Sequence, residues 1–223
     1  MSATGPAIWS LKVPEAYPSP QSETVPDPYN SMESVLGEDF RGLIDPADFV
    51  DGGRFRSIVK IQSRCNNQGE DFWMMASGWL IGTDLLVTAG HVVYDKAYGC
   101  GAATQIKCYI GYNGADSVPK QGSSSDGAVQ PRYGSRVVTT QSWIKDSDSR
   151  LRDVAFIKVH KPFVGDLNVF EFNNNTVSPS TALFGVVGYP GDKNFRGEFG
   201  AQLYELFNNT TYDLDKQPRH MIE

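Results

Sequence analysis

The sequence predicts an all-β protein, and two observations carry this prediction. From Arg54 onward, short runs rich in Val, Ile, Phe and Tyr are separated by Gly, Asn, Asp and Pro, as in strands joined by turns. No segment shows a sustained period near 3.6 residues over the length of a helix. About eight strand runs follow one another, namely FRSIVKIQ, FWMMASGWLI, LLVTAGHVVY, QIKCYIGY, RVVTT, DVAFIKV, ALFGVVGY and AQLYELF.

The clearest strand is QIKCYIGY. Ile106, Cys108 and Ile110 alternate there with Lys107 and Tyr109, and a period of two residues is typical of a β-strand. After it, residues 111–127 are rich in Gly, Ser and Asp and predict a long surface loop. Strand runs on both sides of a second break, at HKPFVGDLNVF, indicate two β-subdomains, and barrel closure is one way to remove their exposed edges.

Length and charge limit the classes of protein to consider. The chain has 223 residues, of which 40% are hydrophobic, so it suffices for one large β-domain or two small ones with a sizeable core. Acidic side chains outnumber basic ones by 26 to 20, giving a net charge of −6. Because a general nucleic-acid binder needs a basic surface, we expect no nucleic-acid partner.

We also expect no membrane partner. The longest apolar stretch, 72–81, is about half of the roughly 20 residues that cross a bilayer, and Ser77 and Gly78 interrupt it. Residues 1–15 lack the basic and continuous apolar regions of a secretory signal. The protein is therefore expected either to stay inside the cell or to carry its export signal outside this chain.

The three cysteines, Cys65, Cys100 and Cys108, allow at most one bridge and do not form a disulfide framework. We expect them to be reduced and partly buried. Their spacing matches no zinc pattern, so no metal site is assigned. The segment GYPGDK lacks the spacing of a phosphate-binding loop, so no cofactor is assigned either.

The most informative segment is SGWLIGTDLLVTAGHVVY, which spans residues 77–94. A β-hairpin there delivers His91 at the end of an apolar strand, and the small residues before it leave space around the imidazole. A base held by rigid scaffold and facing a cleft is what proton transfer requires. The alternative is that His91, taken alone, is a structural histidine.

Asp153 opens the strand DVAFIKV, 62 residues (153 − 91) after the histidine. A carboxylate there can accept the Nδ1 hydrogen of His91, fix its tautomer and stabilise the imidazolium. The alternative is that Asp153 simply ends a turn, with Arg150 or Arg152 as its surface partner.

Taken together, SGWLI, TAGHVV, DVAFIKV and GVVGYPGDK resemble motifs of the chymotrypsin-like serine proteases, in their order. The last motif is the most specific for the glutamyl-endopeptidase branch and its fungal relatives. The resemblance implies a double β-barrel, a protein or peptide substrate, His91 as general base and Asp153 as its orienting partner. The more usual vertebrate pattern has a cysteine directly after the histidine, which forms a disulfide across the hairpin. Here Val92 and Val93 follow His91, so that disulfide cannot form.

The resemblance also implies a domain organisation. Residues 51–160 would form the first barrel with His91 and Asp153, and 161–223 a partial second barrel. Residues 1–50 hold seven of the thirteen prolines and predict an extended arm. In this superfamily such an arm can be an inhibitory pro-segment, and cleavage near Arg41 or Arg54 would release it.

The largest departure from the family concerns the nucleophile. The family requires a serine in a Gly-x-Ser-Gly setting after GYPGDK, but this sequence has no serine after Ser180. We therefore expect the chain to be truncated before its nucleophile. No cysteine follows Cys108 to replace it, and Thr210 and Thr211 lack the surrounding glycines of an oxyanion loop.

The sequence thus favours a serine endopeptidase of the glutamyl-endopeptidase-like family whose nucleophile is absent from this chain. One alternative is a non-catalytic protein that keeps the barrel as a binding scaffold, since a fold does not guarantee activity. Another is a structural β-protein with chance motifs. Retention of both His91 and Asp153 favours the protease, because a scaffold has no chemical need of the pair.

Overall fold

In the computed structural model of the chain, residues 5–22, 38–146, 150–171 and 182–210 are described, and β-strands dominate their regular structure. The strands are β1 (Pro6–Ser10), β2 (Gly42–Leu43), β3 (Ile58–Asn67), β4 (Glu70–Gly82), β5 (Leu85–Thr88), β6 (Tyr94–Asp95), β7 (Gly101–Ala102), β8 (Gln105–Ile110), β9 (Gln130–Thr140), β10 (Ala155–Val159), β11 (Ala182–Gly188), β12 (Asn194–Phe195), β13 (Glu198–Phe199) and β14 (Tyr204–Thr210). The helical turns are α1 (Gly90–Val93), α2 (Gln141–Lys145), η1 (Pro46–Asp48), η2 (Ala115–Ser117) and η3 (Arg150–Arg152). The all-β prediction is confirmed.

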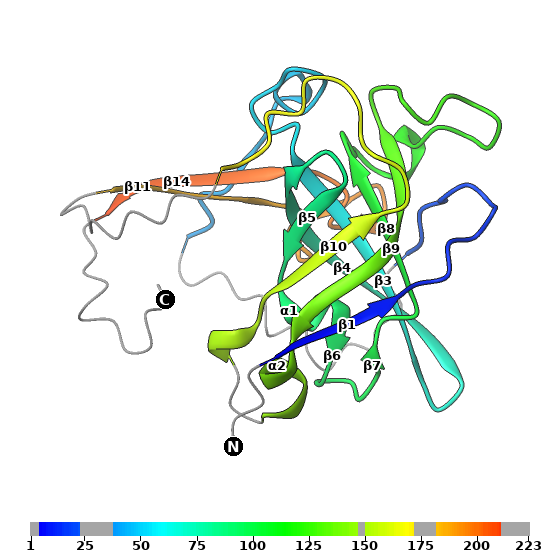
Figure 1. The fold of residues 1–223 in the computed structure, drawn as a ribbon. Helices are drawn as coiled ribbons and strands as arrows, with labels where there is room; N and C mark the ends of the chain where they lie inside the picture. The colour runs from blue at the N-terminus through cyan, green and yellow to red at the C-terminus, as the bar shows by residue number, and fades with distance from the viewer. Residues whose placement is uncertain (1–4, 23–37, 147–149, 172–181, 211–223) are drawn as a thin grey trace.

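Six strands close into a barrel. Their order is β9-β10-β5-β4-β3-β8, and pairing of β8 with β9 completes the ring. The long β3–β4 hairpin forms one wall, in register from Ile58 opposite Trp79 to Asn67 opposite Glu70 (Figure 1). Closure pairs both outer strands of the sheet and so removes its exposed edges.

The barrel is filled by apolar side chains that alternate along its strands. Its buried core comprises Leu11, Val59, Ile61, Leu80, Leu86, Val92, Val93, Ala103, Ile106, Cys108, Ile110, Val137, Ala155, Ile157, Val159, Phe163 and Leu167. The paired strands β4 and β5 approach closely at Gly78. A Cβ at this position would lie only 2.6 Å from the Val87 carbonyl oxygen. The glycine of the SGWLI motif therefore serves close strand packing.

The N-terminal segment lies against the outside of this barrel. β1 pairs antiparallel with β9 (Figure 1), and the chain then runs over β3 and β8. The Gln62 side chain accepts the Gln21 backbone N–H and donates to the Gln21 carbonyl, both at 3.0 Å. Lys107 Nζ donates to the Ser19 carbonyl at 2.6 Å. These contacts satisfy polar groups that the arm buries.

A second, smaller sheet has the order β11-β14-β2 and extends away from the barrel (Figure 1). β2 brings Gly42 and Leu43 opposite Glu205 and Tyr204 of β14. Segment 1–50 therefore contributes strands to both sheets. The domain limits at 50 and 160, and removal of the arm on maturation, stay predictions.

The expectation of three reduced cysteines is wrong. Cys65, near the C-terminal end of β3, forms a disulfide with Cys100, and Cys108 is a free, buried thiol. The physical reason is a tight turn centred on Asp95, whose carboxylate accepts the backbone N–H groups of Ala97, Tyr98 and Cys100. This turn brings Cys100 back to the barrel wall, a contact that residue spacing does not reveal.

None of the helices in the described part of the chain is long and apolar enough to span a membrane.

Alkylation tests the disulfide directly. Denatured but unreduced protein should take up iodoacetamide at Cys108 alone, and reduced protein at all three cysteines, as read by mass spectrometry. Replacing Cys65 and Cys100 together by serine should lower the free energy of unfolding by about 2–4 kcal/mol, because the unfolded chain gains freedom. Uptake at all three cysteines before reduction would contradict the pairing.

Candidate active site

Pairing of two barrel strands brings His91 and Asp153 together. β5 ends at Thr88, and His91 is the second residue of the short helix α1 that follows. β10 runs antiparallel to β5 with Ala155 opposite Thr88, so the residues just before β10 lie beside the residues just after β5. Two side chains separated by 62 residues thereby become neighbours.

The Asp153 carboxylate contacts His91 at two points. Its Oδ2 lies 2.9 Å from the ring Nδ1, and its Oδ1 accepts the His91 backbone N–H at 2.8 Å. The second contact satisfies one of the backbone N–H groups at the start of α1, where Ala89 provides no capping side chain. The carboxylate therefore fixes both the ring and the helix that carries it.

The two partners differ in exposure. The His91 side chain is 61% exposed, whereas that of Asp153 is 25% exposed. With its hydrogen on Nδ1 and directed at the carboxylate, the imidazole presents Nε2 as a base. The arrangement can therefore accept a proton from an incoming group through the exposed ring, while the carboxylate is less accessible to water than the ring.

Burial and hydrogen bonding act in opposite directions on the pKa of Asp153. Burial raises it, but the hydrogen bond and charge of His91 and the backbone N–H groups of His91 and Gly90 lower it, and the net pKa lies below the ordinary value. The carboxylate is consequently ionised at neutral pH and can stabilise an imidazolium.

Gly90 leaves the space that this pair needs. A Cβ at this position would lie 3.0 Å from Asp153 Oδ1 and 3.1 Å from the Trp143 ring. Any larger residue would push against the carboxylate or the indole. The glycine before His91 in the TAGHVV motif thus has a steric reason here.

The GYPGDK turn, which follows β11, is attached to the first barrel. Ser77 Oγ of β4 accepts the Tyr189 backbone N–H at 2.7 Å. Arg41, in the N-terminal segment just before β2, donates to Asp192 at 2.8 Å and so joins that segment to the same turn. Sequence reasoning treated Ser77 as a hairpin residue and Arg41 as a cleavage point, and neither residue type nor spacing indicated these contacts. Thr211, weighed above as a substitute nucleophile, lies outside the described residues.

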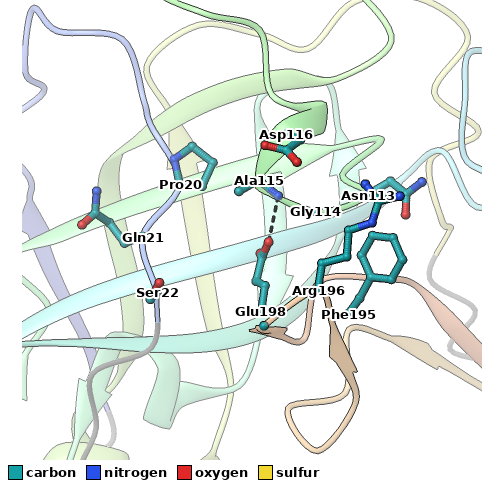
Figure 2. Close-up of a pocket in the computed structure, with 11 residues that line it drawn as sticks. Pro20, Gln21, Ser22, Asn113, Gly114, Ala115, Asp116, Phe195, Arg196 and Glu198 are labelled. Carbon is teal, nitrogen blue, oxygen red and sulfur yellow. Dashed lines mark hydrogen bonds between the residues drawn. The ribbon is translucent and has the colours of Figure 1, made fainter.

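A pocket of about 290 Å³ lies elsewhere, between segment 20–22, loop 113–116 and the β12–β13 hairpin (Figure 2). Glu198 lines this pocket, and its carboxylate accepts hydrogen bonds from the Tyr112 hydroxyl and, at 2.8 Å, from the Ala115 backbone N–H. Neither His91 nor Asp153 lines this pocket. No group of three or more His, Cys, Asp or Glu side chains suited to a metal ion occurs in the described ranges.

Comparisons with known proteins concern the family and the fold of the chain. A family model described as trypsin matches residues 50–209. A glutamyl endopeptidase of Bacillus licheniformis is 30% identical over 169 residues, which are 74% of this chain and 45% of the relative. The chain thus spans less than half the length of that curated relative.

Two solved structures support the fold. A Glu endopeptidase, solved in complex with MPD, superposes with a TM-score of 0.55 at 21% identity, over 81% of this chain and 72% of that one. GrC gives a TM-score of 0.50 at 16% identity, over 75% and 63%. The predicted chymotrypsin-like fold is confirmed, whereas the assignment of residues 161–223 to a partial second barrel stays a prediction.

The lowered pKa of Asp153 gives a pH test. A carboxylate with a lowered folded-state pKa stabilises the fold above its ordinary value of 3.8, and this contribution is lost as pH falls through the folded-state pKa. Asp153→Asn should therefore lose less stability on acidification than the parent chain, as measured by urea midpoints between neutral and acid pH. The exposed Asp116→Asn is the matched control. Parallel pH curves for Asp153→Asn and the parent would contradict the assignment.

Proposed function

The chain belongs to the trypsin family, and on this premise we propose that it carries the general base and the orienting acid of a serine endopeptidase of the glutamyl-endopeptidase-like branch. His91 is the base and Asp153 the orienting acid. The observation that carries the proposal is the two-point contact of the Asp153 carboxylate with the Nδ1 and backbone N–H of His91.

The proposed chemistry is acyl transfer through a serine. His91 takes the proton of the attacking hydroxyl and returns it to the leaving amine, so the peptide C–N bond breaks as the acyl–oxygen bond forms. Asp153 remains ionised and stabilises the imidazolium between the two transfers. Water then hydrolyses the acyl-enzyme, with His91 again as the base.

The nucleophile is proposed to come from sequence outside these 223 residues. No serine follows Ser180. Ser77 is one of the earlier serines that the structure describes, and its Oγ accepts a hydrogen bond from the Tyr189 backbone N–H. The small sheet supports this proposal. Val186 and Leu206 are directly opposite on neighbouring strands and are 72% and 37% exposed, as expected of a barrel wall that further strands would cover.

A peptide or protein is the proposed substrate. The curated relative is named for glutamyl specificity, so peptides with Glu before the cleaved bond are the first to test. The absent serine favours one alternative, a non-catalytic binding protein with a protease fold. Against it stands the retained geometry of His91 and Asp153, for which a scaffold has no chemical need.

An assay of two proteins separates these functions. The 223-residue chain should release no product from casein or a Glu-containing peptide. A chain extended by the reading frame that follows residue 223 should contain Gly-x-Ser-Gly and hydrolyse the peptide. In the extended chain, His91→Ala should reduce kcat on the order of 10⁴-fold or more, and Asp153→Asn by about 10⁴-fold.

His160→Ala is the matched control, since His160 is exposed and makes its contacts with Tyr133, whose backbone N–H its Nδ1 accepts at 2.9 Å and whose ring lies 6.0 Å from its own. It should leave kcat within about twofold, because a residue outside the reacting groups does not contribute to transition-state binding. Turnover by the 223-residue chain that a serine-directed inhibitor abolishes would contradict the proposal about the nucleophile. A stop codon directly after residue 223 in the transcript would favour the binding protein.

A further inference from the structure

Two consecutive threonines at the end of β9 hold the backbone on both sides of Asp153. Thr139 Oγ1 donates to the Val154 carbonyl at 2.7 Å, and Thr140 Oγ1 donates to the Arg152 carbonyl at 3.2 Å. Backbone pairing of β9 with β10 begins only at Ala155, opposite Thr139. The two hydroxyls therefore add hydrogen bonds between β9 and the chain beyond the end of the β9–β10 backbone pairing, at the residues on either side of Asp153.

Thr140 also organises the helix that follows. Its Oγ1 accepts the Trp143 backbone N–H at 3.0 Å and so caps the start of α2. One hydroxyl can donate once and accept as well, so the two bonds are compatible. The segment before Asp153 and the first turn of α2 are thereby tied to the same oxygen atom.

Trp143 carries this connection to the helix of His91. Its indole Nε1 donates to the Tyr94 carbonyl at 2.9 Å, directly after the last residue of α1. Its ring packs against Gly90, where a Cβ would meet it at 3.1 Å. Lys96 Nζ lies 4.5 Å from the centroid of the same ring. The indole is therefore held by contacts with α1, with the Tyr94 carbonyl and with the Lys96 side chain.

The short helix α1, which carries His91, depends on these contacts for its position. α1 has only four residues, and a helix of that length has no stability of its own in water. Its N-terminal end is fixed by Asp153, whose Oδ1 accepts the His91 N–H, and its C-terminal end by Trp143. The position of the imidazole thus depends on two contacts that both lead back to Thr140.

We propose that Thr140 and Trp143 are positioning residues that hold His91 and Asp153 in hydrogen-bonding geometry. Their relevance to catalysis rests on the function proposed above, whereas their effect on the geometry does not. The proposal can therefore be tested in the 223-residue chain, without turnover.

The test uses the proton NMR signal of a strongly hydrogen-bonded imidazole N–H. The parent chain should show a low-field resonance that disappears in His91→Ala, which assigns it to the Nδ1 hydrogen shared with Asp153. Thr140→Val, which keeps the shape but loses the hydroxyl, and Trp143→Phe, which loses the indole N–H, should each lose this resonance or shift it upfield. Thr140→Ser should retain it, because the hydroxyl is restored.

Trp9→Phe is the matched control for the indole change, since the buried Trp9 Nε1 has no hydrogen-bond partner among the described residues. It should leave the resonance in place. Near-ultraviolet circular dichroism of each variant checks that it is folded. If Thr140→Val is unfolded, Trp143→Phe alone tests the positioning role. An unchanged resonance in folded Thr140→Val and Trp143→Phe overturns the proposal.

Two further outcomes separate this proposal from the proposed function. If the parent shows no resonance that His91→Ala removes, even near 0 °C where exchange of the imidazole hydrogen with water is slow, the pair itself is not formed and both proposals fail. If the resonance responds as expected but the extended chain hydrolyses nothing, the positioning role stands and the protease function fails. In an active extended chain, Thr140→Val should lower kcat with little change in KM, and Thr140→Ser should restore it.

Discussion

Antiparallel pairing of β5 with β10, with Thr88 opposite Ala155, is the constraint on which both the barrel and the site depend. It joins the hairpin that carries His91 to the strand that follows Asp153. Because the register is fixed by backbone hydrogen bonds, the chain just beyond each strand emerges at the same place. A shift of one residue would turn each side chain of β10 to the opposite face and separate the pair.

Polar side chains in this protein often hold backbone rather than other side chains. Gln62 and Lys107 bind the carbonyls of the N-terminal segment, Asp95 binds three backbone N–H groups near Cys100, and Thr140 binds a carbonyl before Asp153. Each such bond fixes a loop to a strand that is already rigid. Loops without regular structure thereby acquire defined positions close to the barrel and the site.

Much of the fold was predictable because strand periodicity is a local signal. The runs that contain β3, β4, β8 and β10 were visible as alternating or apolar segments, and His91 and Asp153 stood out because they lie in recognisable motifs. β1 was missed, since five residues in a proline-rich segment carry no periodic pattern. In β8 the alternation marks one apolar face, yet Lys107 is also buried because the N-terminal segment covers the other face.

The sequence by itself determined the all-β class, the two candidate residues and the absence of a serine after Ser180, since all three depend on residue type and local order. Only the tertiary structure decided that Cys65 pairs with Cys100 and that Thr140 and Trp143 brace the His91–Asp153 pair. These contacts join residues far apart in the chain, through turns whose geometry depends on backbone hydrogen bonds. Sequence spacing carries no record of such contacts, because strand pairing and loop packing create the proximity.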